Sequence, residues 1–308
     1  MVYHETRIVN GEKMNYLIDN QRFQKKWKKT SKFIGKGNLQ KSEVNKLKSE
    51  FEIELKVNKS YEHLKKEQVL KVEQLKKEYN QGIKNLSEEE FVKFERTFFT
   101  ELTYNSNAIE GNSMSLEETS LVVNENLSPE GKTLREVYEA KNHIRALEFI
   151  KNYTGEINEL FVLKIHFLIM KDISERFGGR YRENPVRVLG SDFKFPPSEK
   201  IPQLMKNLFY WYNKNKKKMH AFELAVIFSM KFVSIHPFID GNGRVSRLLM
   251  NFILQKKKYP WINVYNRQRQ KYLIAVRKAN EEDYGLILIF LIETIKENMI
   301  DFGFLKKE

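Results

Sequence analysis

The 308-residue chain contains no cysteine, which excludes disulfide bonds, thiolate zinc sites and cysteine nucleophiles, and favours a reducing compartment. The longest uninterrupted apolar run, LILIFLI at 286–292, is far shorter than the ~20 residues of a membrane-spanning helix. The first residues, MVYHETRIVNGEKM, lack the apolar core of a secretory signal. We therefore expect a soluble, cytoplasmic protein with no membrane partner.

Apolar side chains are plentiful, because 41% of the residues are hydrophobic and 13% are aromatic, which is enough for a globular core. The net charge is +14, but the basic excess is spread along the chain. Residues 1–90 hold 20 Lys and Arg against 14 Asp and Glu, and the remainder holds 34 against 26. Lysine clusters such as KKWKK and KNKKK are typical of solvated faces, and no recognised nucleic-acid motif accompanies them. The sequence motifs therefore do not support a nucleic-acid partner.

The first 85 residues divide into two kinds of segment. In RIVNGEKMNYLI, an Asn-Gly pair separates two short runs of strand character, which predicts a tight hairpin. With the run KTSKFIG, this predicts a small antiparallel sheet over 3–36, within a first region at 1–38. Residues 39–85 are rich in Lys, Glu, Leu and Val and lack proline, which favours exposed helices of a linker or an interaction region.

The third predicted region, 86–305, is mainly helical. Ser87 with Glu90, Ser115 with Glu118, and Thr133 with Glu136 have the spacing of capping boxes, which mark helix starts. Apolar residues recur at helical spacing through most of this region. The exception is 181–197, YRENPVRVLGSDFKFPP, whose prolines, glycine and Val-Arg-Val predict a short extended hairpin. The predicted fold class is therefore mainly α, with a small amino-terminal β-sheet.

Chemistry concentrates in residues 236–247, HPFIDGNGRVSR. Pro237 ends the preceding helix and holds His236 at a helix terminus. The glycines and the asparagine at 241–243 allow a tight turn into the next helix, whose free amides and positive dipole end suit an anion. Arg244 and Arg247 lie three residues apart and add charged groups suited to phosphate oxygens. Asp240 beside them suits a Mg²⁺ ion shared with phosphate. Together these residues predict a base next to a magnesium–nucleotide site.

The same twelve residues fulfil the signature of the Fic family, His-x-Phe-x-Asp/Glu-Gly-Asn-Gly-Arg-x-x-Arg, at all eight specified positions. The resemblance covers roughly residues 87–300. GGRYR followed by VRVLGS looks like the flap of the family, and KYLIAVRKAN looks like its adenine-side helix. Residues 1–85 lie outside the resemblance.

Members of the family usually transfer AMP from ATP to a hydroxyl of a target protein and release pyrophosphate. The resemblance implies that His236 is the general base on a Ser, Thr or Tyr hydroxyl, and that Asp240 binds the Mg²⁺ cofactor. It also implies a set of residues that contact the ATP co-substrate: Gly241, Asn242, Gly243, Arg244 and Arg247 at the phosphates, Tyr272 and Asn280 at the nucleoside, and Val188, Leu189, Gly190 and Ser191 in the flap.

TYNSNAIEGN resembles the inhibitory motif of members whose autoinhibitory helix precedes the core, here near 103–112. The motif residues are Ser106, Glu110 and Gly111. The resemblance implies that Glu110 pairs with Arg247 and occupies the place of the γ-phosphate. ATP would then bind in a pose unfit for transfer, because misplacing the reacting atoms by ~1 Å can cost ~10²-fold in rate.

Three alternatives stay open in the sequence. The same site could remove AMP from a modified protein, with Glu110 aligning the water, or it could transfer a different nucleotide. A non-enzymatic interaction or nucleic-acid-binding module on the lysine-rich surface is the third, and the intact His236 and Asp240 argue against it. In the main interpretation, the target protein could be the chain itself. The sequence does not decide between a monomer and a homodimer, nor does it identify the target. His166, in the apolar stretch LKIHFLIM, is interpreted as a packed core histidine rather than a catalyst.

Overall fold

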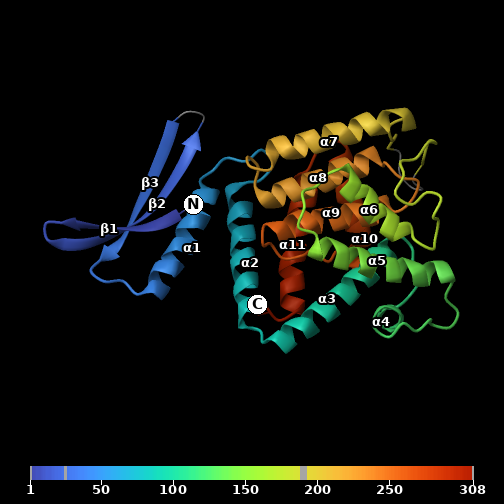
Figure 1. Cartoon of the computed structure of the whole chain (residues 1–308), viewed down its shortest axis with the longest axis horizontal. Helices are drawn as coiled ribbons and strands as arrows, with labels where there is room; N and C mark the ends of the chain where they lie inside the picture. The colour runs from blue at the N-terminus through green and yellow to red at the C-terminus, as the bar shows by residue number, and fades with distance from the viewer. Residues whose placement is uncertain (1, 24–25, 188–192, 307–308) are drawn as a thin grey trace. The chain divides into compact units, whose positions relative to one another are not determined.

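The computed structural model describes residues 2–23, 26–187 and 193–306 (Figure 1). Their contacts divide the chain into two compact units, of which the first comprises 1–61 with 65–74 and the second 62–64 with 75–308. Each unit is described by itself. The sequence-based division at 38/39 and 85/86 stays a prediction, while the mainly α fold class with a small β-sheet is confirmed.

The first unit is built on a three-stranded antiparallel sheet with the order β1-β2-β3: Val2–Val9, Glu12–Phe23 and Lys26–Lys36. Asn10 and Gly11 connect β1 to β2 with positive φ angles of 52° and 77°, as a tight Asn-Gly hairpin requires. The helix α1, Lys41–Val57, packs one face of the sheet. Its side chains meet those of the sheet in an apolar cluster: Val2, Leu17, Ile34, Leu47, Phe51 and Leu55.

The second unit is helical, and the capping boxes predicted from the sequence mark three of its helix starts. Ser87, Ser115 and Thr133 each accept a hydrogen bond from the amide three residues on. The helix α2, Lys66–Asn85, begins in the first unit. It is followed by α3 Glu88–Ile109, α4 Leu116–Asn124, α5 Leu134–Asn152, α6 Glu159–Met170, α7 Ile201–Asn215, α8 Ala221–Ile235, α9 Asn242–Lys256, α10 Arg269–Asn280 and α11 Gly285–Asp301, with 3₁₀ turns at Ser198–Lys200 and Asn266–Gln268.

The helices α8 and α9 form the centre of this unit (Figure 1). Their side chains, such as Phe228 and Leu249, are almost fully buried. The helix α8 is apolar around most of its circumference, whereas α9 also buries polar side chains such as Arg244 and Arg247. The turn that joins them carries His236 to Gly241. The predicted catalytic sequence is therefore fixed to the most deeply packed helices of the unit.

The segment expected to form a hairpin flap does not show paired strands where it is described. Residues 181–187 and 193–197 contain no strand, and Val188 to Ser191 lie outside the described residues. The prolines at 185, 196 and 197 lack the amide hydrogens that a strand ladder needs, which is a physical reason for the irregular backbone on both sides. Among the residues described, none of the helices is long and apolar enough to cross a membrane.

Candidate functional site

The turn between α8 and α9 places His236 at the end of a helix in a left-handed conformation. Its φ angle is 50°, and its amide still donates to the Phe232 carbonyl at 3.1 Å. Gly241 then begins α9 with a φ angle of 78°, and an added Cβ there would lie 3.3 Å from Ile169. The positive φ angle favours glycine at this position, and the space beside Ile169 would be tight for a side chain.

Two buried side chains hold the turn in shape. Asn242 accepts a hydrogen bond from the Phe238 amide at 3.0 Å and donates to the Phe238 carbonyl at 2.8 Å. His166 on α6 stacks on the Phe238 ring with a centroid distance of 3.6 Å and donates to the Asp240 carbonyl at 3.1 Å. Its other ring nitrogen accepts from the Gly179 amide, which fixes the tautomer. His166 is packed in the core as expected, but it also positions the turn.

Arg182 supports the backbone of His236 from a separate segment. Its guanidinium donates to the His236 carbonyl at 2.8 Å, and its amide donates to the Pro237 carbonyl at 2.9 Å. The same guanidinium donates to the Asn184 and Pro196 carbonyls at 2.9 and 2.6 Å. One buried side chain therefore ties the turn to both sides of the predicted flap segment.

His236 is held in a form that can accept a proton. Burial is the main cause that lowers its pKa to about 4, the Arg182 charge adds to this, and Glu110 and Asp240 act in the opposite direction. The Phe195 ring covers it at a centroid distance of 4.2 Å. The imidazole is therefore neutral at neutral pH, as a general base must be.

Asp240 belongs to a network of two carboxylates and two arginines. Arg135 on α5 contacts Asp240 at 2.6 Å and Glu139 at 3.3 Å, while Arg244 on α9 contacts Glu139 at 3.2 Å and Asp240 at 3.3 Å. Burial alone would raise the pKa of Asp240, but Arg244, the Gly241 amide and Arg135 together hold it below its usual value. Asn112, two residues beyond Glu110, donates to Glu139 at 2.9 Å.

Arg247 is buried and is bound by the predicted inhibitory motif. Its guanidinium donates to the Ser106 hydroxyl at 3.1 Å, to the Ser106 carbonyl at 2.8 Å and to the Glu110 carboxylate at 2.8 Å. An added Cβ on Gly243 would lie 2.2 Å from the same Glu110 oxygen, so the carboxylate sits against the first turn of α9. Gly111 follows with a φ angle of 104° and turns the chain away.

The predicted nucleoside residues lie in two different places. Tyr272 on α10 is buried, and its hydroxyl interacts with Arg247. Asn280, at the end of α10, accepts from the Ser234 hydroxyl at 2.8 Å and lines a cavity of about 430 Å³ together with Ser234 and Ile235, which directly precede His236. The predicted flap residues Val188, Leu189, Gly190 and Ser191 lie outside the described residues.

Asp240 suits a divalent cation only in combination with ligands from elsewhere. The described part of the chain has no group of three or more His, Asp or Glu side chains arranged for a metal. A single carboxylate with 39% of its side-chain surface exposed still fits Mg²⁺, which is commonly held by one or two carboxylates, phosphate oxygens and water. The donor set therefore fits a magnesium–nucleotide and not a free structural metal.

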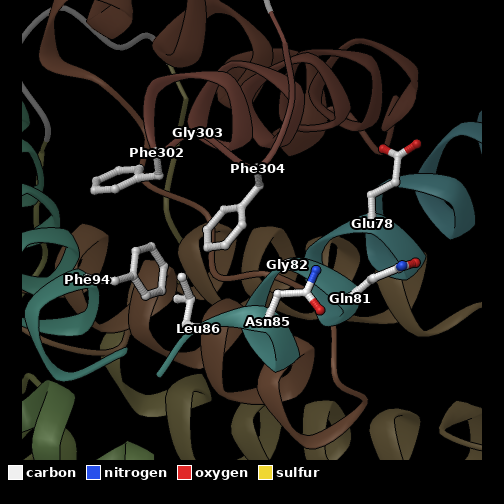
Figure 2. Close-up of a pocket in the computed structure, with 9 residues that line it drawn as sticks. All are labelled: Glu78, Gln81, Gly82, Asn85, Leu86, Phe94, Phe302, Gly303 and Phe304. Carbon is white, nitrogen blue, oxygen red and sulfur yellow. The ribbon is translucent and has the colours of Figure 1, made fainter. Parts of the chain in front are cut away.

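A second cavity, of about 500 Å³, lies between α2, the start of α3 and the end of the chain (Figure 2). Figure 2 shows the rings of Phe94, Phe302 and Phe304 on one side of it and Gln81 and Asn85 on the other. Gly82 is needed here, because an added Cβ would lie 2.4 Å from the Phe304 ring. Of the predicted site residues that the structure describes, none lines this cavity.

Comparison with known proteins finds similarity in the helical unit. Residues 156–254 match the family model described as Fic/DOC family. Over 205 residues, or 64% of this chain, it is 31% identical to a protein of Drosophila virilis named protein adenylyltransferase Fic, and 32% identical to the protein of that name from Drosophila erecta. The match spans only 41% and 40% of the length of these relatives.

Two solved structures share the fold. A Fic-domain-containing signalling protein from Bacteroides thetaiotaomicron is similar with a TM-score of 0.68 and 25% identity, over 77% of this chain and 100% of that one. Fic-1 from C. elegans has the same TM-score of 0.68 at 22% identity, over 85% of this chain and 77% of that one.

Four residues of the site were not found from the sequence: Arg135, Glu139, His166 in its positioning role, and Arg182. They come from α5, α6 and the segment after α6, far from 236–247 in the chain. The spacing of residues within one motif carries no information about such partners. Only the GGRYR match pointed near one of them, Arg182.

Proposed function

We propose that this protein transfers AMP from ATP to a Ser, Thr or Tyr hydroxyl of a target protein, and that Glu110 inhibits the reaction. The relatives named protein adenylyltransferase support the reaction class, although the match covers two fifths of their length. The arrangement of His236, Asp240 and the first turn of α9 supports the site. The inhibitory role is supported by the position of the Glu110 carboxylate, which accepts a hydrogen bond from Arg247 and lies against Gly243.

In the proposed reaction His236 removes the proton of the target hydroxyl as its oxygen attacks the α-phosphorus. The bond between the α-phosphorus and the bridging oxygen breaks, and pyrophosphate leaves with that oxygen. A neutral histidine with a depressed pKa is competent at neutral pH, and a positioned base typically contributes ~10²- to 10⁴-fold in rate. Arg182 and His166 keep the base and the turn in place.

The first turn of α9 supplies the anion site. The Asn242 and Gly243 amides lie in the first turn and have no helical partners, while the Gly241 amide donates to the Asp240 carboxylate at 2.5 Å. The positive end of the helix dipole would face a bound phosphate. Asp240 would hold Mg²⁺, which would neutralise charge on the phosphates. Arg247 would then bind the terminal phosphate with the guanidinium that Glu110 now occupies.

Glu110 inhibits in this proposal by taking the place of an anion. A carboxylate on Arg247 and against Gly243 repels a phosphate from the same position and satisfies the guanidinium that the phosphate needs. ATP bound beside it would be shifted away from in-line attack, and small shifts of the reacting atoms are costly. The pair of Ser106 hydrogen bonds keeps Arg247 aimed at Glu110.

The test is Glu110→Gly with Mg²⁺ and each nucleoside triphosphate in turn, followed by intact-mass measurement of the protein and of a bait. We expect a mass gain of one AMP with ATP, formed much faster than by the wild type. The double variant Glu110→Gly with His236→Ala is the matched control and should show none. A gain with another triphosphate would identify a different donor, and no gain with any would contradict the proposal.

The opposite direction has one observation in its favour. The Glu110 carboxylate lies against Gly243 in the first turn of α9, which directly follows the turn that carries His236, so it is close to the proposed phosphate site. It could therefore align a water that removes AMP from a modified protein. Incubating wild type with an AMP-modified substrate separates the two: release of AMP that Glu110→Gly abolishes would favour removal.

A further inference from the structure

The sheet of the first unit has an aromatic face outside the residues that match the Fic/DOC family. The register pairs Glu5 with Tyr16 and Tyr16 with Phe33, and side chains alternate along each strand. The register shifts by one residue between the pairs Asn15–Gly35 and Tyr16–Phe33, and this bulge places Phe33 opposite Tyr16. One face therefore carries aromatic rings from all three strands, here called the aromatic face: Tyr3 of β1, Tyr16 of β2, and Trp27 and Phe33 of β3.

Contacts between these side chains support the assignment. The Tyr16 and Phe33 rings are 5.5 Å apart in an edge-to-face arrangement, and the Arg7 guanidinium lies 4.6 Å from the Tyr16 centroid. Lys29 reaches across to Glu5 at 3.6 Å, and Glu5 also pairs with Arg7 at 2.6 Å. Rings and cations are therefore interleaved on one surface, with Glu5 as an acid among them.

The aromatic face is not the core face of the sheet. The cluster with α1 uses the other face, through residues such as Val2, Leu17 and Phe51. On the aromatic face, Tyr3 is 40%, Phe33 50% and Trp27 68% exposed. Solvated faces of antiparallel sheets are usually polar, and several large exposed rings on one face are typical of a binding surface.

The charge of this segment indicates the kind of partner. Residues 1–38 hold nine Lys and Arg against three Asp and Glu, whereas 39–90 hold eleven against eleven. The whole basic excess of the first 90 residues is therefore on the sheet segment, so the charge is less evenly spread than the division of the chain at residue 90 indicated. Because the sheet segment is basic, a polyanion is favoured as the partner. Because aromatic rings stack on flat groups, a polyanion with exposed planar groups is favoured further.

We propose that the aromatic face binds single-stranded nucleic acid. Unpaired bases would stack on Phe33, Tyr3 and Trp27, while the phosphates would meet Arg7, Lys29 and the surrounding lysines. Proteins that bind single strands without strong sequence preference combine these two features, often on the open face of an antiparallel sheet. A duplex hides its base faces and would use the cations only. This inference does not depend on the proposed AMP transfer.

The test uses the full chain and fluorescein-labelled (dT)₂₀ and (rU)₂₀, with fluorescence anisotropy at 50 mM and 200 mM salt. Phe33→Ala should weaken binding about 5- to 100-fold, because stacking contributes ~1–3 kcal/mol per base. Phe33→Tyr keeps a ring and should bind like the wild type. Tyr210→Ala removes an even more exposed ring from α7, outside the sheet, and should have no effect.

The charge contribution has its own readout. Arg7→Gln should reduce the slope of log affinity against log salt by about 0.7, the value for one phosphate contact with a single strand. Lys217→Gln, an exposed lysine on the second unit, should leave that slope unchanged. Tighter binding of one oligonucleotide would tell whether the natural strand is DNA or RNA.

Three results would overturn the proposal. One is no binding of either oligonucleotide at 100 µM protein and 50 mM salt. Another is a Phe33→Ala variant that has the circular dichroism spectrum of the wild type and binds the oligonucleotides with unchanged affinity. The last is equal affinity for a 20-base-pair duplex, which would assign binding to charge without stacking.

Discussion

Arg135 and Asp240 form a 2.6 Å ion pair between α5 and the turn that carries the candidate base, 105 residues apart in the chain. The arginine occupies the carboxylate oxygen that a divalent cation would need. The Glu139 carboxylate contacts the same guanidinium at 3.3 Å. In the ligand-free protein a fixed positive charge therefore stands beside the proposed metal carboxylate.

We expect Arg135→Gln to bind Mg²⁺ more tightly, because the cation no longer competes with a guanidinium for Asp240. The exposed fraction of the Arg135 side chain is 59%, so the pair is weak, and the gain should be about two- to fivefold. Mn²⁺ titration followed by electron paramagnetic resonance, with and without a non-hydrolysable ATP analogue, measures it. Arg145→Gln is the matched control, since Arg145 on the same helix pairs with Asp172.

Unchanged or weaker metal binding in Arg135→Gln would show that the arginine does not compete for Asp240. Arg135→Lys keeps the charge but not the planar guanidinium. Its metal affinity should therefore lie between those of the wild type and Arg135→Gln. Because metal binding is read directly, the result is informative even if no AMP transfer is found.

The pH dependence of the reaction should show an unusually low acid limb. Because the folded pKa of His236 is about 4, the base stays unprotonated down to well below the usual 6.5. Glu110 raises the pKa of His236, so the Glu110→Gly variant should have a His236 pKa no higher than that of the wild type. The pH at which the rate begins to fall should therefore not increase. We expect kcat/KM to be flat between pH 8 and pH 6. A loss of half the rate near pH 6.5 would mean that His236 is solvated when the substrate binds.

Removing His166 should loosen the turn without touching the substrate. His166→Phe retains the stacking on Phe238 but leaves the Asp240 carbonyl and the Gly179 amide without their partner. Each unsatisfied buried group costs ~1–3 kcal/mol, which for a unit of this size lowers Tm by several degrees. Thermal unfolding by circular dichroism measures the loss, with the exposed α6 variant Leu160→Ala as control. An unchanged Tm would mean that water replaces the ring nitrogens.

Acid should destabilise the protein below about pH 6.5. Burial lowers the pKa of His236 and His166 to about 4, and that of His143 well below its usual value. The unfolded chain takes up these protons near pH 6.5 while the folded one does not, so stability falls as pH falls. At pH 5.5 each histidine contributes a loss of about 1 kcal/mol. Urea unfolding at pH 7 and 5.5 measures it, and an equal midpoint would contradict the buried neutral state.

The helical architecture could be predicted from local signals. These signals are the capping boxes at Ser87, Ser115 and Thr133 and the Asn-Gly turn. Each depends on residues only a few positions apart, so its geometry can be predicted from the local sequence. The pairing of Glu110 with Arg247 was expected only from family resemblance, and the two side chains are indeed 2.8 Å apart.

The supporting residues could not be predicted, because their partners lie in other elements. Arg135 and Glu139 look like an ordinary pair one turn apart on an exposed helix, yet both contact the start of α9 or its preceding turn. Asn242 was expected at the phosphates, which stays a prediction, and its side chain also closes the turn on Phe238, a role that the sequence did not indicate. The chemistry of a single residue does not indicate which side chains from other elements will contact it in the folded protein.

Arg182 gives the site a shared reference point. Its guanidinium and amide reach the backbone of His236, Pro237, Asn184 and Pro196 at once. Asn184 and Pro196, which flank the predicted flap, are therefore fixed relative to the backbone of His236 by one rigid guanidinium. In the proposed reaction, a target bound beside either residue would meet the imidazole at a separation that this one side chain sets.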